Sequence, residues 1–196
     1  MALDMEPEAL WSISYGIFIV CSCSEGKASG QIANTVFQVS AEPPRIAVAI
    51  NKKNFTHDLI TASDIMTVSV LDDETPMQLI GRFGFRSGRD FDKLEGVETM
   101  EGNHGCPCVT EHAVSVFEAE VFGSVDVGTH TLFVADVVSG KMLSDKQPLT
   151  YAMYHDKKGK APETAPTYRG KTPETAPTYT GVEPPNAPTY WGGDKK

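Results

Sequence analysis

The segment 51–56 holds the side chains best suited to chemistry, because it places asparagines, lysines and a threonine at the end of a predicted strand. A helix is predicted to begin near Thr56, and the N-terminus of a helix presents free backbone N–H groups. With two lysines and a hydroxyl beside them, these groups are a suitable site for a phosphate. The same residues are also compatible with ordinary capping of the helix, which needs no ligand.

Other polar groups recur at positions where they can serve the same ligand. The loop 85–93 contains glycine, serine and several basic residues, and it can close over an anion. Asn34 and Gln38 are placed on one outward face of a predicted strand, where amides either bind the edge of a flat heterocycle or face water. His130 follows a glycine-containing turn; such a histidine is usually structural, but it can also hold the edge of a substrate.

Three common catalytic motifs are missing from the sequence. No G-x-G-x-x-G follows a predicted strand, no G-x-x-x-x-G-K-[ST] is present, and no G-x-S-x-G occurs. A Rossmann dinucleotide site, a P-loop and a hydrolase nucleophile elbow are therefore not supported.

The distribution of charge also favours a small anionic ligand. The net charge is −9, but residues 1–154 carry 10 basic and 21 acidic side chains, whereas residues 155–196 carry 7 basic and 5 acidic ones. An acidic body disfavours nucleic acid and anionic membranes as partners. Six of the ten basic residues of the body nevertheless fall between positions 52 and 93. This local excess indicates either an anion site or a solvated charged face.

The cysteines form two C-x-C pairs, at positions 21 and 23 and at positions 106 and 108. The N-terminus has no basic region typical of a secretory signal, so we expect a cytoplasmic protein with free, buried thiols and no disulfide. His104 and His112 flank the second pair, but C-x-C spacing fits a structural zinc site poorly, and no metal site is predicted. The longest apolar run, 17–21, is too short to cross a bilayer.

Alternating and continuous apolar patterns predict a mainly β body. Two short helices are expected, one from Thr56 to Ala62 and one that starts at Thr75-Pro76. Without βαβ alternation, these elements favour an antiparallel barrel. The predicted strands cover residues 15–21, 31–40, 45–50, 65–71, 113–122 and 131–138.

The composition changes at Tyr154, and we predict a body of 1–154 followed by an extended tail of 155–196. The tail holds seven of the 13 prolines and repeats Ala-Pro-Thr-Tyr every 11 residues. Proline in each copy excludes a helical supercoil and favours extended or polyproline-II chain. The tail is either a soluble spacer or a set of tyrosine anchors that dock on this protein, its twin or a partner. The tyrosines concerned are Tyr168, Tyr179 and Tyr190.

An ordered set of segments over about residues 10–154 resembles the flavin reductase-like FMN-binding split-barrel proteins. The likeness is nearest to the branch of flavoredoxin, ferric reductase and NADH:rubredoxin oxidoreductase. Some members of that branch carry a C-terminal rubredoxin domain, for which this chain has no C-x-x-C pair. The resemblance implies a homodimer of six-stranded antiparallel split barrels with FMN at the subunit boundary. The segments that carry it are 30–40, 43–57, 68–71, 83–93, 105–107, 128–137 and 148–151.

The resemblance also implies roles for individual residues. Asn34 and Thr35 would contact the isoalloxazine ring, next to the backbone of Gln31, Ile32 and Ala33. His130 would lie near the flavin or the nicotinamide and is the catalytic candidate, although Thr129 stands where the family often has an aspartate. The ribityl chain and phosphate would be held by Asn51, Lys52, Asn54, Thr56, Ser87 and Lys93.

The expected function follows from these roles. We expect an FMN-dependent oxidoreductase that passes reducing equivalents from NAD(P)H through FMN to rubredoxin, ferric iron or free flavin. Hydride transfer then needs no protein acid, and positioning supplies most of the rate. One alternative is a non-enzymatic FMN electron carrier that serves protein partners. Another is an interaction protein in which the barrel is a scaffold for the tail.

Overall fold

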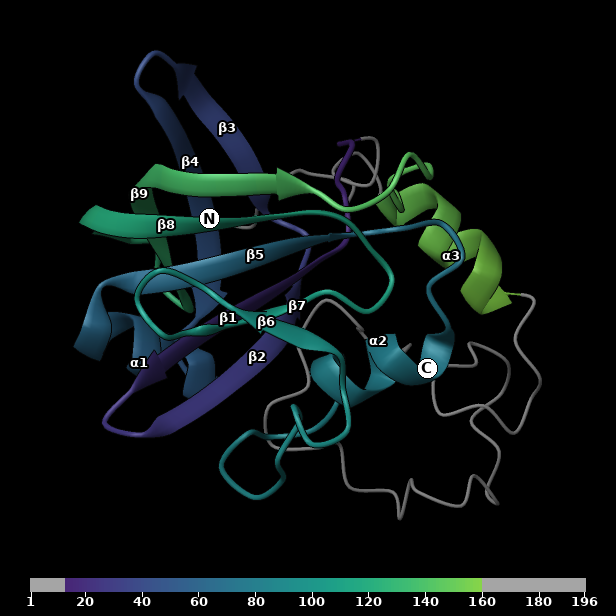
Figure 1. Ribbon diagram of the computed structural model, residues 1–196, viewed down its shortest axis with the longest axis horizontal. Helices are drawn as coiled ribbons and strands as arrows, with labels where there is room; N and C mark the ends of the chain where they lie inside the picture. The colour runs from purple at the N-terminus through teal and green to yellow at the C-terminus, as the bar shows by residue number, and fades with distance from the viewer. Residues whose placement is uncertain (1–12, 160–196) are drawn as a thin grey trace, which may run out of the picture.

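The computed structural model describes residues 13–159, which form a rolled antiparallel sheet with three helices (Figure 1). The first residues of the predicted extended tail, 155–159, are instead helical, and the rest of the tail with its tyrosine repeats lies outside the described residues. The elements, in order, are β1 (Phe18–Ser24), β2 (Lys27–Ala33), β3 (Val36–Ala41), β4 (Pro44–Asn51), α1 (Phe55–Ser63), β5 (Ile65–Leu71), α2 (Met77–Gly84), β6 (Thr99–Glu101), β7 (Pro107–Val109), β8 (Ala113–Asp126), β9 (His130–Met142) and α3 (Tyr151–Gly159).

The main sheet has seven strands in the order β2-β1-β5-β8-β9-β4-β3, and every pair of neighbours is antiparallel. The mainly β, antiparallel prediction is confirmed. The predicted strand 31–40 is in fact two strands, because the chain leaves β1 after Ala33 and pairs with β4 from Val36. The two edge strands of the sheet, β2 and β3, are therefore consecutive in sequence and are joined by Asn34 and Thr35.

The two faces of the sheet bury separate hydrophobic clusters. Successive side chains of a strand point to opposite faces, so Val20 joins the cluster inside the rolled sheet, whereas Ile19 and Cys21 join the cluster beneath α2 and α3. The inner cluster includes Val48, Ile50, Met66, Val68 and Phe133; the outer one includes Ile17, Leu79, Ile80, Phe83, Leu149 and Tyr154. Both sets are almost fully buried.

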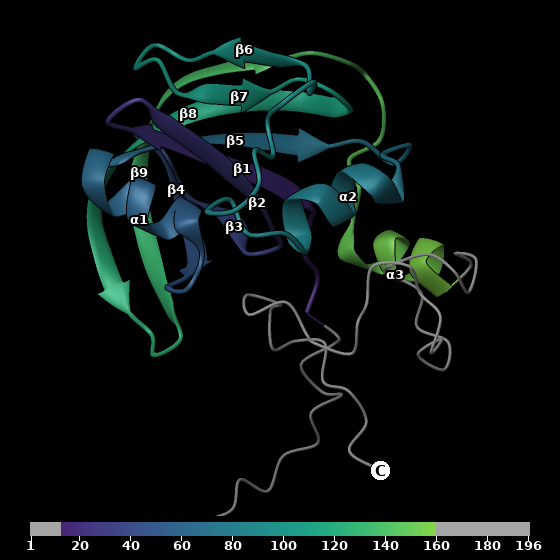
Figure 2. The ribbon, with the colours of Figure 1, turned by 90° about the horizontal axis from the view of Figure 1, so that it is seen from below.

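A short hairpin of β6 and β7 covers part of the outer face, as Figure 2 shows. The Thr67 hydroxyl donates to the Pro107 carbonyl, and the Ser69 hydroxyl donates to the Val109 carbonyl, each over 2.6 Å. These two bonds from β5 fix β7 across the sheet. They bring Cys108 of β7 and the preceding Cys106 next to β1, whose cysteines are more than 80 residues away in sequence.

A disulfide joins Cys23 to Cys106 at this crossing. The expectation of four free thiols is therefore wrong for this pair. The spacing of the cysteines did not indicate the bond, because the two partners meet only through the packing of β7 on β1. Cys21 and Cys108 are free and buried, as expected.

The helices differ from their predicted bounds at their starts. Asn54, and not Thr56, is the N-cap of α1, and Pro76 is the N-cap of α2. The Thr75 hydroxyl bonds to Asp72 instead of capping α2. α3 was not predicted, and it continues past the predicted boundary at 154. Within residues 13–159, no helix is long and apolar enough to cross a membrane.

Candidate functional site

One cavity collects residues from β2, β4, β9, all three helices and the loop after α2. Figure 1 shows α1 and α3 on opposite sides of the molecule, with β2 and α2 between them, and the cavity takes lining residues from all four elements. Eleven of the twelve predicted site residues line it: Gln31, Ile32, Ala33, Asn34, Thr35, Asn51, Asn54, Thr56, Ser87, Lys93 and His130.

The start of α1 presents polar groups to one end of the cavity. Asn54 has extended backbone angles, but its side chain makes no capping bond and instead donates from Nδ2 to Gln31 Oε1 over 2.9 Å. Thr56 is 1% exposed and its side chain lines the cavity, where its hydroxyl makes no hydrogen bond to the described residues. An uncapped first turn beside a hydroxyl that reaches the cavity favours an anionic group of a ligand.

The link between β2 and β3 provides amide and hydroxyl groups to the same cavity. Thr35 Oγ1 donates to Asn34 Oδ1 over 3.1 Å, which leaves the Asn34 amide nitrogen available as a donor. Gln38 does not join Asn34 as predicted. It lies on β3, is exposed, and donates to the Ser40 carbonyl outside the cavity. The break between β2 and β3 accounts for this error.

His130 faces the cavity from the first position of β9. It pairs in register with Asn51, the last residue of β4, so both side chains come from neighbouring strand ends. Its Nδ1 lies 2.8 Å from the Thr129 hydroxyl. Partial burial lowers the pKa of His130, and the imidazole is therefore mainly neutral at pH 7. It can accept or donate a hydrogen bond to a ligand without adding charge.

Lys93 is a buried amine in the cavity wall, only 6% exposed. Its Nζ donates to the Gly30 carbonyl over 3.0 Å and to the Phe83 carbonyl over 2.9 Å. Burial lowers the pKa of Lys93 to about 8. Two of its three N–H groups thus connect β2 to the end of α2, and one remains for a ligand.

The close approach around Lys93 depends on Gly30. A Cβ at this position would lie 2.6 Å from the Cys21 sulfur and 3.0 Å from the Phe83 ring. Such contacts are too short for real side chains, so any larger residue would displace β1 or α2. Glycine is required here by packing and not by its backbone conformation.

Most of the predicted basic cluster is used elsewhere in the fold. Lys52 does not line the cavity, because its Nζ lies 2.6 Å from Asp126 Oδ1 on β8. Arg82 donates to backbone carbonyls of the loop after α2, and Arg89 pairs with Asp58 over 2.7 Å. The cations that line the cavity are Lys93 and Arg86, whose guanidinium lies 4.4 Å from the centre of the Phe91 ring.

Several cavity residues were not predicted from the sequence. Tyr151 and Tyr154 line the end near α3, with ring centres 6.1 Å apart and planes at 30°. The only sequence signal for them is the i, i+3 spacing of two aromatic residues, which places both on one helix face. Phe85, Arg86 and Gly88 belong to the loop that was predicted to close over an anion. The other lining residues that were not predicted are Ile17, Ala49, Phe55, Ile80, Phe83 and Gly84.

Comparison with known proteins gives a consistent family. The model of the flavin reductase like domain matches residues 10–160. A ferric-chelate reductase (NAD(P)H) of Archaeoglobus fulgidus is 54% identical over 165 residues, which cover 84% of this chain and 98% of the relative. A high molecular weight rubredoxin of Moorella thermoacetica is 42% identical over 84% of this chain and 72% of its own length.

A solved structure agrees with these relatives. The FMN-binding protein from Thermus thermophilus, with bound p-hydroxybenzaldehyde, superposes with a TM-score of 0.66 at 26% identity, and the match covers 74% of this chain and 81% of that one. The antiparallel fold, the cavity and the family model lead to one conclusion: the chain belongs to the flavin reductase-like family.

Proposed function

We propose that this protein is an FMN-dependent oxidoreductase that takes electrons from NAD(P)H and delivers them to an iron chelate or a small redox protein. The observation that carries the proposal is a cavity whose lining combines the uncapped start of α1 with the aromatic rings of α3. FMN has the matching shape and chemistry, with a phosphate on a flexible chain and a flat, largely apolar ring.

The donor set fits each part of that cofactor. The start of α1, with Thr56 and Asn54, suits the phosphate. The loop with Ser87 and Arg86 also lines the cavity and lies close to α1, because Arg89 pairs with Asp58. Asn34 offers an amide donor to a ring edge. Because the body as a whole is acidic, the two cations that line the cavity would have to neutralise the two negative charges of the phosphate.

Bound FMN would supply the redox chemistry, accepting two electrons from a nicotinamide and releasing them to an acceptor. The chain itself binds and orients. Neutral His130, at the start of β9, can hydrogen-bond to the carboxamide or ring edge of the nicotinamide. Asn51, which is in register with it on β4, limits the space open to that ring. Apolar side chains such as Ile80 and Phe83 exclude water from the other side.

The acceptor is proposed from the relatives. The Archaeoglobus relative is named for a ferric chelate and NAD(P)H, and the Moorella relative is named as a rubredoxin. We therefore propose ferric chelates as the first acceptor and rubredoxin as a protein partner, with free flavin as a further acceptor. The cytoplasm, where nicotinamide dinucleotides are regenerated, is the proposed location.

A homodimer is the proposed assembly. Large apolar side chains remain exposed on β3, β8 and β9, among them Phe37 at 49%, Phe122 at 54% and Met142 at 67%. Exposed apolar groups of this number are typical of a surface that another chain covers. Light scattering of the purified protein tests this: a dimer mass supports it, and a monomer mass at micromolar concentration contradicts it.

Anaerobic reduction of the FMN-loaded protein tests the function. NADH and NADPH are added separately, and bleaching of the flavin absorbance is followed by addition of ferric citrate or rubredoxin. Bleaching by either nicotinamide, reversed by an acceptor, supports the proposal. A flavin that binds but is reduced by neither nicotinamide would contradict it and favour the electron-carrier alternative.

A further inference from the structure

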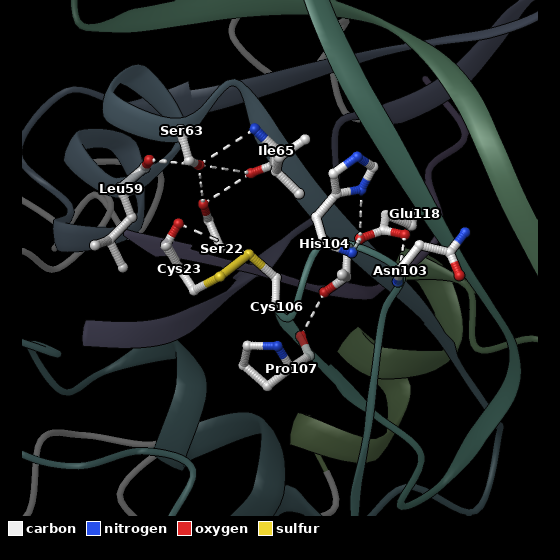
Figure 3. The surroundings of a disulfide bond; sticks show 11 residues. Ser22, Cys23, Leu59, Ser63, Ile65, Asn103, His104, Cys106, Pro107 and Glu118 are labelled. Carbon is white, nitrogen blue, oxygen red and sulfur yellow. Dashed lines mark hydrogen bonds and ion pairs between the residues drawn. A yellow bond between two sulfur atoms is a disulfide. The ribbon is translucent and has the colours of Figure 1, made fainter. Parts of the chain in front are cut away.

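Figure 3 shows the Cys23–Cys106 disulfide. It connects two parts of the chain that both contribute residues to the cavity lining. Cys23 lies on β1, whose hairpin partner β2 ends in the cavity lining at residues 31–33. Cys106 lies before β7, and the segment 85–98 that leads into the β6–β7 hairpin includes the cavity residues Ser87 and Lys93. The bond is therefore a covalent tie between two walls of the site.

The two sulfur-bearing residues differ in their exposure. Cys106 is 1% exposed, whereas Cys23 is only partly buried, one residue before the end of β1. An external thiolate therefore approaches the bond from Cys23. Attack at this sulfur forms a mixed disulfide on Cys23 and releases Cys106 as the leaving thiolate.

The neighbouring thiols do not take part in exchange. Cys21 lies two residues from Cys23 on β1, Cys108 lies two residues after Cys106 on β7, and the two free thiols are 0% and 4% exposed. Burial raises the pKa of both thiols, so neither forms the thiolate that exchange requires at neutral pH. Reduction of the disulfide therefore depends on a reagent from outside.

We propose that Cys23–Cys106 is a thiol–disulfide exchange site for a dithiol reductant, and that its redox state alters cofactor binding in the cavity. The dithiol is oxidised to its own disulfide, and the two protein sulfurs take up two electrons and two protons as Cys23 and Cys106 thiols. Disulfides of intracellular proteins commonly have such redox-sensing roles. The second part of the proposal rests on the proposed flavin function.

Two ties hold the segment 85–106 to the β1–β2 hairpin. Lys93 Nζ bonds to the Gly30 carbonyl beside the cavity, and Cys106 bonds covalently to Cys23 further along. Gly30 is in register with Cys21, so both ties act on the same pair of strands. Reduction removes the covalent tie and increases the freedom of the cavity wall, which a ligand must then order again. By linkage, bound cofactor in turn favours the oxidised form.

Differential alkylation tests the exchange site. The native, full-length protein is treated with dithiothreitol, trapped with iodoacetamide without denaturant, and analysed by peptide mass spectrometry. We expect Cys23 to be alkylated and the peptide cross-linked through Cys23–Cys106 to disappear, while Cys21 and Cys108 remain unlabelled. If the disulfide resists reduction until denaturant is added, or if all four cysteines are labelled together, the exchange site is refuted.

FMN titration by fluorescence quenching tests the coupling. We expect the reduced protein, and a C23S/C106S variant with unchanged circular dichroism, to bind FMN at least threefold more weakly than the oxidised protein. The matched control is Cys108→Ala, which removes a thiol two residues from Cys106 but leaves the disulfide. Equal dissociation constants for oxidised and reduced protein would refute the coupling. If neither form binds FMN, the proposed function fails instead, and the alkylation pattern still decides the exchange site.

Discussion

Two regions of the molecule bury polar groups: the sheet beneath the β6–β7 hairpin and the start of α1. They differ in whether those groups have hydrogen-bond partners within the protein. Beneath the β6–β7 hairpin, Glu118 of β8 accepts from the backbone N–H groups of Asn103 and His104 over 2.8 and 3.0 Å, and Thr67 donates to a carbonyl. At the start of α1, the Thr56 side chain lines the cavity, and its hydroxyl makes no hydrogen bond within the described part of the chain. Paired groups stabilise the fold, whereas unpaired ones facing a cavity indicate a ligand.

Replacing Glu118 should give the largest effect on stability. Glu118→Leu leaves two backbone N–H groups without acceptors and removes the partner of His104, so we expect a loss of about 3 kcal/mol in the free energy of unfolding. Urea unfolding measures it. The FMN affinity of the folded protein should stay the same.

The neighbouring exposed carboxylate is the control for this experiment. Glu120→Leu affects the same strand but only a surface pair with His104, and it should change stability by less than about 1 kcal/mol. A loss below about 1 kcal/mol for Glu118→Leu would remove the contrast between the two regions.

Lys93 should make stability depend on pH in the alkaline range. Its pKa is about 8 in the folded protein and is lowered from 10.5, so the unfolded chain binds more protons between these values. The cost of burying the charge is present below pH 8 and is relieved as pH rises. We expect wild type to gain about 2 kcal/mol relative to Lys93→Met between pH 7 and 10.

Chemical unfolding at several pH values measures this difference. Lys53→Met, at an exposed lysine, serves as the control and should show no such dependence. A constant difference between wild type and Lys93→Met would mean that the Lys93 amine is solvated.

Thr56→Val should change ligand binding without changing stability. The hydroxyl has no protein partner, so its loss leaves the fold intact, but FMN binding should weaken by about 1–2 kcal/mol, roughly tenfold. Isothermal titration with FMN measures it. Thr61→Val in the same helix, where the hydroxyl bonds to the His57 carbonyl, should leave the affinity unaltered. An unchanged dissociation constant for Thr56→Val removes this residue from the phosphate site.

Lys52 should give the smallest effect. Its exposed pair with Asp126 contributes little to stability, and the side chain lies outside the cavity lining. Lys52→Met should weaken FMN binding less than threefold, and this difference should vanish at high salt. A tenfold loss would instead support the phosphate contact that the family resemblance implies.

The strands were predictable where a local pattern is sufficient. Alternation predicted Ile65–Leu71 with its observed bounds. It failed at Asn34–Thr35, because the alternation of polar and apolar residues continues across the break, and only pairing with different neighbours separates β2 from β3. α3 was missed because Tyr151–Gly159 carries few aliphatic residues and no apolar stripe.

The site residues, like the strands, were predictable where the signal is local and were missed where it depends on a distant partner. Most lining residues lie in short segments whose chemistry is visible locally, such as 31–35 and 51–56. Lys52 lies outside the cavity because it pairs with Asp126, 74 positions away in the sequence. The disulfide likewise joins two cysteines that are 83 positions apart. Local spacing carries no information about such distant pairs. The charge pattern therefore wrongly predicted Lys52 as part of an anion site, and the cysteine pattern wrongly predicted that Cys23 and Cys106 are free thiols.

The link at Asn34–Thr35 affects how easily the two edges of the rolled sheet separate. It joins the two edge strands, β2 and β3, and the hydrogen bond from Ala49 N to the Thr35 carbonyl lies beside it. A molecule bound between 31–35 and 51–56 bridges the two margins and holds them together. Ligand binding should therefore slow hydrogen exchange at the Ala49 amide more than at the amides of the central strands. The exchange rate at this edge of the sheet then measures how much of the protein has ligand bound.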